Sequence, residues 1–474
     1  MMPSWFALVV LAAGALASTS SAIVVQLLFC LFGATAALEL TALGGAPVLP
    51  AVAFLPFLLG RAWSERWRSA LGRVPPAGVW LLVTVAWAVF SALVVPRVFG
   101  GIVAVKTYDR TGGDSAITTL LRPVSGNITQ SAYAVLDALV FFAMRTLLAG
   151  RGRMNTFARA VLLLAFANAF AAMIGLGEFY VGLPRILEAI RTANYTVYET
   201  YELGGVARVQ GTFSEAAVFS MFTLPLFAFT SSLWFSRASS PNAGWLALGS
   251  LFLLLISTSG TAYVGLAAYL TILSLTLVAR LLMHGSLPRL RSLFVLASGF
   301  TAVLCLVLIA SPEPLARATS FFDATVMRKL NSSSGVDRAA ANQLAWSDFL
   351  ATYGLGVGLG STRASSFALV LLSNLGILGA VGFVGFFVNV LRSPATDDSS
   401  ESVTARAARQ AVLAGLIGAC VVGTVFDLGI AFYCFAAAAT VTRRDIALAE
   451  SAVLDAGRLG ELGVSMKRGS PNPV

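Results

Sequence analysis

Long apolar stretches separated by short polar segments run through the whole sequence of 474 residues. Several of these stretches continue for about 20 residues, which is the length that an α-helix needs to cross the hydrocarbon core of a bilayer. The pattern predicts an all-α polytopic membrane protein with about 12–13 transmembrane helices. The first run, at 5–17, and the last stretch, at 411–440, leave the number of helices and the side of the N-terminus open.

The predicted helices follow one another with short connections. We expect them at 5–17, at 22–40, in a run that ends near 60, and then at 79–95, 132–148, 161–181, 215–235, 294–310 and 367–390. A tight hairpin is expected around Gly260, and a closely spaced pair of helices within 411–440, where Asp427 and Gly429 interrupt the apolar run. The acidic and serine-rich segment 393–409 is typical of a flexible loop.

Composition supports the same class of protein. The chain is 57% hydrophobic and 11% charged, with a mean hydropathy of +0.83, whereas soluble domains are roughly 45–50% apolar and about 25% charged. We therefore expect residues 1–441 to form one transmembrane domain and 442–474 to form a cytoplasmic tail. A separate soluble catalytic domain is excluded by the lack of a long polar stretch.

The net charge of +10 comes largely from arginines in the loops between apolar runs. The segment after the third run, for example, holds Arg61, Arg66, Arg68 and Arg73, which is the pattern of a cytoplasmic loop. Nucleic acid is therefore not an expected partner. Counting helices from this loop predicts three main outer segments, at 97–130, 184–214 and 311–365.

Residue types also limit the chemistry. The single histidine, His284, lies in an expected cytoplasmic loop, so histidine-based zinc sites and serine–histidine triads on the outer face are excluded. All four cysteines fall in apolar runs, with neither a disulfide framework nor metal-ligand spacing. No metal and no cofactor are expected.

Three polar motifs are expected on the outer face. Residues 208–215 read RVQGTFSE and continue directly into an apolar helix. Residues 336–338 read VDR, with Trp346 following, and residues 354–366 read GLGVGLGSTRASS before the apolar stretch LLSNLGILG. Because no strand precedes the alternating glycines, they do not fit a dinucleotide fingerprint and indicate a backbone bend.

In this order, the three motifs resemble the bacterial superfamily of O-antigen ligases and Wzy-type repeat-unit polymerases. The resemblance covers roughly residues 205–385 and implies periplasmic glycosyl transfer by a membrane glycosyltransferase of the inner membrane, with a family-C-like fold. Ligases of this superfamily have a histidine near the start of the last helix, where this sequence has Ser365 and Ser366. The difference favours an exopolysaccharide or O-antigen polymerase.

The resemblance implies that donor and acceptor are polyprenyl-diphosphate-linked oligosaccharides, in contact with membrane lipid, with a chain-length regulator as a candidate partner. The leaving lipid diphosphate needs positive charge, and arginine binds phosphate oxygens in pairs. The expected catalytic residues are Arg208, Arg338 and Glu215. The expected diphosphate- or substrate-binding residues are Arg363, Arg122, Tyr201 and Gly211.

Several of these residues have a plain structural alternative. Outer-loop arginines often anchor a protein at the lipid headgroups. Glu215 is either the general base for the acceptor hydroxyl or, with Thr212, a capping box that begins the next helix. Tyr201 and its neighbours Tyr195 and Tyr198 either stack on sugar rings or form an interfacial aromatic belt.

Four charged residues lie in or near apolar runs, where charge is costly: Asp137, Arg145, Glu178 and Asp427. Each is either functional or a structural partner of another helix. At the level of function, two alternatives to the polymerase stay open. One is an O-antigen ligase that transfers glycan to the lipid A core, and the other is a lipid-linked oligosaccharide flippase, which is a transporter.

Overall fold

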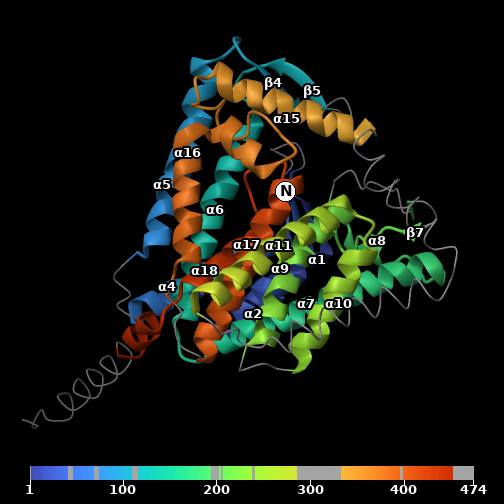
Figure 1. Ribbon diagram of the computed structural model, residues 1–474, viewed down its shortest axis with the longest axis vertical. Coiled ribbons are helices and arrows are strands. Elements are labelled where there is room, and N and C mark those ends of the chain that lie inside the picture. The colour runs from blue at the N-terminus through green and yellow to red at the C-terminus, as the bar shows by residue number, and fades with distance from the viewer. Residues whose placement is uncertain are drawn as a thin grey trace, which may run out of the picture.

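Helices make up most of the described part of this protein (Figure 1). The computed structural model describes residues 2–40, 46–68, 74–108, 116–193, 202–203, 206–236, 241–284, 333–394 and 399–451. Within these ranges, six helices are long and apolar enough to cross a membrane: α5 (Pro76–Val98), α6 (Ser125–Leu148), α7 (Arg153–Tyr180), α9 (Ala216–Phe235), α16 (Phe367–Leu391) and α17 (Ser400–Val422). The expectation of a mostly helical chain with several helices of membrane-spanning length is confirmed.

Further helices and three small sheets belong to the described chain. The other helices are α1 (Trp5–Leu16), α2 (Thr19–Phe29), α3 (Pro50–Ala53), α4 (Leu55–Arg68), α8 (Ile186–Ile190), α10 (Pro241–Ile256), α11 (Gly260–His284), α15 (Ser333–Ala351) and α18 (Ile430–Thr440). The strands form three small antiparallel sheets: β1 (Met2–Pro3) with β2 (Leu38–Leu40) and β3 (Ala46–Val48), β4 (Ala104–Tyr108) with β5 (Ala116–Leu120), and β6 (Glu202–Leu203) with β7 (Val206–Ala207).

Most predicted helix positions agree with the structure. The helices expected at 79–95, 161–181 and 215–235 correspond to α5, α7 and α9. The expected hairpin around Gly260 is formed by α10 and α11. The helix expected at 294–310 lies outside the described residues.

The helix expected at 22–40 is wrong in its second half. α2 ends at Phe29, and the chain then turns several times before β2 begins. A Cβ atom at Gly33 would lie 2.5 Å from the ring of Phe213, so the turn brings the backbone directly against a side chain of a distant motif. Apolar composition did not distinguish this packed turn from a continuing helix.

The flexible loop expected at 393–409 is also wrong from Ser400 onward, where α17 begins. The hydroxyl of Ser399 accepts a hydrogen bond from the backbone N–H of Ser402 at 3.3 Å, which is a normal N-cap for a helix. Val403 and Ala407 are buried on the inner face of the first turns. Serine capping and a small apolar face therefore outweigh the polar composition of this segment.

α16 is broken in its middle. Gly376 has φ 63° and ψ −163°, which interrupts the helical ladder and leaves carbonyl groups free to bind elsewhere. The carbonyl oxygens of Ser373 and Asn374 accept hydrogen bonds from the backbone N–H groups of Val357 (2.7 Å) and Gly358 (3.0 Å). Polar backbone groups inside a membrane must form their hydrogen bonds within the protein. The carbonyl groups freed by the break therefore need the N–H groups of this neighbouring segment.

The neighbouring segment is the glycine loop, residues 354–360, and its conformation confirms the predicted bend. Gly354, Gly356, Gly358 and Gly360 all have positive φ angles, which favour glycine. At Gly356, a Cβ atom would lie 2.7 Å from the backbone nitrogen of Gly376. The alternating glycines thus allow the loop to lie directly against the broken helix.

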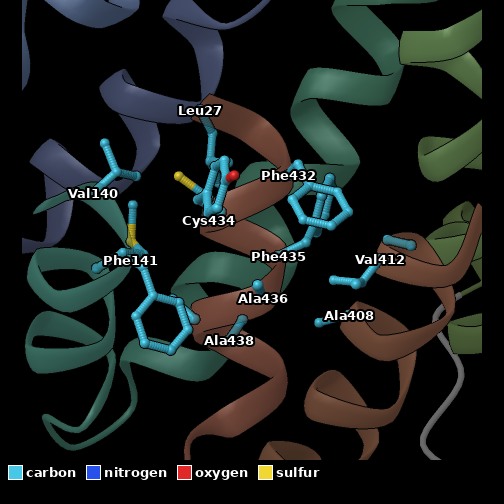
Figure 2. Packing of buried hydrophobic residues seen from close by; sticks show 14 of the residues in the cluster. Leu27, Val140, Phe141, Ala408, Val412, Phe432, Cys434, Phe435, Ala436 and Ala438 are labelled. Atoms are coloured by element: carbon cyan, nitrogen blue, oxygen red, sulfur yellow. The ribbon is translucent and has the colours of Figure 1, made fainter. Parts of the chain in front are cut away.

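α18 lies in the centre of the apolar core. Figure 2 shows Phe432, Cys434 and Phe435 of this helix among side chains from three other helices. The neighbours labelled there come from α2 (Leu27), α6 (Val140, Phe141) and α17 (Ala408, Val412). A run of alanines, 436–439, is almost completely buried, and small side chains of this kind let helices approach closely in a membrane.

The two ends of the bundle differ. At the α15 end, the β4–β5 hairpin and α15 lie over the ends of α5, α6 and α16 (Figure 1). At the α4 end, partly buried ion pairs join distant segments: Arg145 with Asp445 at 2.8 Å, and Arg153 with Glu65 at 3.0 Å. Arg145, one of the charges noted within an apolar run, is therefore a structural partner.

The substitution Gly376→Ala tests the broken helix. A Cβ atom at this position would lie 2.4 Å from the carbonyl carbon of Leu355, in a positive-φ conformation that alanine disfavours. We expect a loss of roughly 2–4 kcal/mol in unfolding free energy, measured as a lower melting temperature in detergent. The matched control, Gly249→Ala in α10, meets no atom within 4 Å and should melt like the wild type.

Candidate functional site

A cavity of about 1060 Å³ opens between the α15 end and the middle of the bundle. This volume slightly exceeds the usual range for small-molecule sites, about 300–1,000 Å³. Its walls come from the first half of α6, the segment 359–363, the turn after α2, α9, and the link between α17 and α18. Segments far apart in the sequence therefore meet around one large space inside a membrane protein.

Three basic side chains line this cavity: Lys106, Arg122 and Arg363. Lys106 belongs to β4, Arg122 follows β5, and Arg363 follows the glycine loop. The backbone N–H of Arg363 donates to the carbonyl oxygen of Lys106 at 3.1 Å, so these two cations sit on directly joined backbone segments. The structure thus brings together the two predicted residues Arg122 and Arg363, and it adds Lys106, which was not predicted as a site residue.

Two buried asparagines hold the segment that carries Arg363. The side-chain amide of Asn127 donates to the carbonyl oxygen of Leu359 (2.7 Å) and the hydroxyl of Ser361 (2.8 Å). Asn374 donates to the carbonyl oxygen of Thr362 at 3.1 Å and accepts from the N–H of Gly360 at 3.0 Å. Polar asparagines within mostly apolar helices could have marked these positions in the sequence. The sequence did not show, however, that both side chains bind the segment that carries Arg363.

A buried carboxyl group supports the same segment from α15. Asp348 is only 1% exposed, and its Oδ2 accepts a hydrogen bond from the hydroxyl of Thr362 at 2.9 Å. Burial raises the pKa of Asp348 to about 7, although the hydrogen bond from Thr362 lowers it in part. Lys106 reaches toward α15 as well, with Nζ 3.4 Å from the carbonyl oxygen of Asp337. The position of α15 and the basic wall of the cavity are therefore linked.

The predicted catalytic residues Arg208, Arg338 and Glu215 form a second group. Burial lowers the pKa of Arg208, the charge of Glu215 raises it, and the charge of Arg338 lowers it, so both charges act on this guanidinium. The Nε atom of Arg208 is buried, and no described residue accepts a hydrogen bond from it. Two cations and one carboxylate close together leave a net positive charge, which favours an anion.

The motif around Arg208 is held in place by hydrogen bonds to distant segments. Thr212 donates its hydroxyl proton to the carbonyl oxygen of Leu31, and Arg191 donates from Nε to the carbonyl oxygen of Gly211 at 3.1 Å. Gly211 has a φ of 55°, and this turn requires it. Arg191 was not among the predicted site residues, because the apolar spacing of segment 184–191 predicted only a helix in the membrane interface.

The capping-box interpretation of Thr212 and Glu215 is wrong. α9 begins at Ala216, with Glu215 itself as the N-cap residue, and its side chain makes no capping hydrogen bond. The hydroxyl of Thr212 is used by Leu31 instead. Glu215 therefore acts as a charge partner of Arg208, and its role as a general base stays a prediction.

The remaining predicted residues have varied positions. Tyr201, with Tyr195 and Tyr198, lies outside the described residues. Glu178 accepts a hydrogen bond from the backbone N–H of Leu187 at 2.8 Å and so holds α8, which is a structural role. Arg208, Arg338 and Glu215 do not line the cavity. Phe213, which belongs to the same motif as Arg208, does line it. The group around Arg208 is therefore adjacent to the cavity that Lys106, Arg122 and Arg363 line.

These features define a class: a helical membrane protein with a deep internal cavity and two basic groups. Comparison with protein-family models gives no match, and neither does comparison with curated protein sequences. Within the described residues, no group of three histidine, cysteine or carboxylate side chains is placed to hold a metal ion. The chemistry that the described site offers is anion binding by arginine and lysine next to a cavity large enough for sugars.

The substitution Asp348→Asn tests the buried carboxyl group. Because the pKa of Asp348 is raised from 3.8 to about 7, the stability gained in the protonated state is full below about pH 4 and is lost as the pH rises toward 7. Asparagine does not ionise, so the variant should lose this pH dependence and be more stable than the wild type at pH 8, by on the order of 4 kcal/mol. Melting temperatures between pH 4 and 8 measure this difference.

The matched control is Asp337→Asn, whose side chain is exposed on the same helix. This variant should keep the pH dependence of the wild type. Equal pH profiles for the wild type and Asp348→Asn would contradict the raised pKa.

Proposed function

We propose that this protein polymerises polyprenyl-diphosphate-linked oligosaccharide repeat units by glycosyl transfer at the periplasmic side of the bacterial inner membrane. The observation that carries the proposal is the cavity of about 1060 Å³, with Lys106, Arg122 and Arg363 on its wall, next to the group formed by Arg208 and Arg338. The resemblance of the three sequence motifs to the Wzy-type superfamily supports the same activity.

Two separate basic groups suit a polymerase in particular. Its donor and its acceptor both carry a lipid diphosphate, so the reaction needs positive charge in two places. One group, on the cavity wall, combines Lys106 with Arg122 and Arg363. The other pairs Arg208 with Arg338. In a ligase, only the donor has a lipid diphosphate, so this arrangement favours the polymerase.

The proposed chemistry requires that negative charge on the departing diphosphate be neutralised. Guanidinium groups do this with paired hydrogen bonds and stay charged at all working pH values. Arg208 is partly buried, and charge interactions are stronger away from bulk water. We therefore assign Arg208 and Arg338 to the leaving diphosphate, and the cavity wall to the acceptor lipid.

The substitutions Arg208→Ala and Arg338→Ala test the proposal. Purified protein in proteoliposomes receives fluorescent polyprenyl-diphosphate repeat units, and the products are separated on a gel. Each variant should form polymer about 10²–10³ times more slowly than the wild type, because one charge that stabilises the departing diphosphate is lost. The matched control is Arg185→Ala, whose side chain is 73% exposed on the approach to α8, and it should polymerise normally.

The same assay separates the alternatives. Wild-type rates in both alanine variants would contradict the assignment of the two arginines. Transfer of glycan to a lipid A core without polymer formation would identify a ligase. Movement of the labelled lipid across the bilayer without a new glycosidic bond would identify a flippase.

Chelation of divalent metal ions is a further test. Because guanidinium groups supply the neutralising charge in the proposed reaction, polymerisation should continue at its full rate in EDTA. The rate is compared with and without added magnesium, at constant ionic strength, since salt screens exposed charges. A loss of activity that magnesium restores would contradict a metal-independent reaction.

A lipid-linked oligosaccharide flippase is the second candidate, and one observation favours it. Asp427 lines the cavity from the link between α17 and α18, beside Asp137, which lies close to the middle of α6. Carboxyl groups inside a membrane often belong to transport or proton pathways. In a flippase, a proton gradient would drive movement of the lipid, and this is measurable in the same proteoliposomes.

A further inference from the structure

A pair of carboxyl groups lies at the cavity, on elements other than those that carry its three basic side chains. Asp427 lines the cavity, and Asp137 lies behind it in α6, only 2% exposed. The two side chains hydrogen-bond to each other. Two ionised carboxylates cannot form such a bond, because one of them must donate a proton, and a pair that shares a single proton keeps one negative charge.

The proton of this pair is placed on Asp137 by its surroundings. Asp137 Oδ2 is buried, and no described residue donates a hydrogen bond to it. Asp427 is better suited to the negative charge, because its Oδ1 accepts a hydrogen bond from the backbone N–H of Gly429 at 2.6 Å. The group that faces the cavity is therefore the carboxylate, and the group behind it is the acid.

A polar stripe of α6 leads from the basic wall to this pair. Gln130 and Tyr133 line the cavity. Tyr133 follows Gln130 by three residues and Asp137 follows Tyr133 by four, so all three lie on the same face of the helix. Gln130 Oε1 is buried and has no partner among the described residues. An unsatisfied amide oxygen above a carboxylate fits a ligand that is rich in hydroxyl groups, such as a sugar.

We infer that Asp427 accepts the proton of the acceptor hydroxyl during glycosyl transfer, with Asp137 as its positioning residue. This inference rests on the proposed polymerase function and names the base for that reaction. It replaces Glu215 in this role, because Glu215 interacts with Arg208 and does not line the cavity.

The proposed step balances. A lone pair of the acceptor hydroxyl oxygen forms a bond to the anomeric carbon of the donor. The bond from that carbon to the diphosphate oxygen breaks, and its electron pair leaves with the diphosphate. The hydroxyl proton passes to the carboxylate of Asp427 and later to water in the cavity, which restores the enzyme.

The other titratable groups near Asp137 and Asp427 are less suited to accept the substrate proton. Tyr433 of α18 interacts with both carboxyl groups, and Cys434 of α18 and Cys30 at the end of α2 lie close by. All three are neutral groups in apolar surroundings, whereas the three basic side chains of the cavity lie on the β4–β5 hairpin and the glycine-loop segment. Asp427 is the anionic group that the described part of the cavity presents to a substrate.

The substitution Asp427→Asn separates the chemical role from a structural one. Asparagine has the same shape and still accepts the hydrogen bond from Gly429, but it does not accept a substrate proton. We expect kcat for polymerisation to fall by about 10²–10⁴, with KM little changed. The wild-type rate should decline at low pH as the carboxylate becomes protonated, and the residual rate of the variant should lack this decline.

Two further variants protect the test against simple misfolding. Asp427→Glu restores a carboxylate and should recover part of the lost turnover. Asp137→Asn still presents a neutral N–H donor to Asp427, so it should lose no more than about tenfold, the worth of one neutral hydrogen bond. The matched control is Glu450→Gln, an exposed carboxylate at the α4 end, which should have wild-type activity.

The outcomes distinguish the inference from the function on which it rests. Wild-type turnover and an unchanged pH profile in Asp427→Asn would overturn the role of Asp427 and leave the polymerase proposal intact. A folded Asp427→Glu variant as slow as Asp427→Asn would also overturn it. A wild-type protein that forms no polymer from lipid-diphosphate repeat units would overturn both.

Discussion

The hydrogen bonds between the glycine loop and the broken helix α16 are the constraint on which the candidate site depends. The break at Gly376 exposes carbonyl groups within a membrane-length helix, and the loop amides of Val357 and Gly358 bind two of them. Unsatisfied backbone groups cost several kcal/mol each in hydrocarbon. The loop is therefore held against the helix, and it carries Arg363 with it.

Polar side chains extend this constraint across the bundle. Asn374, two residues before the break, binds the loop at Gly360 and Thr362, and Asn127 binds it from the start of α6. Buried polar networks of this kind fix one arrangement, because every alternative leaves polar groups unpaired. The cations on the cavity wall are thereby preorganised, which is what electrostatic stabilisation of a charged reaction requires.

Charge is distributed unevenly around the cavity. Basic groups lie on the hairpin and glycine-loop segments, whereas the carboxyl pair Asp137–Asp427 lies on α6 and the α17–α18 link. A substrate with an anionic diphosphate and a neutral glycan matches this polarity in one orientation.

The sequence by itself determined the membrane class, most helix positions and the bend at the alternating glycines, because apolar length and glycine content are local properties. It also singled out Arg208, Glu215 and Arg338, which influence one another in the fold. Only the tertiary structure decided that Glu215 is no capping box and that Asp427 lines a cavity with Arg363. These outcomes depend on contacts between segments far apart in the chain, such as Thr212 with Leu31, which no local pattern encodes.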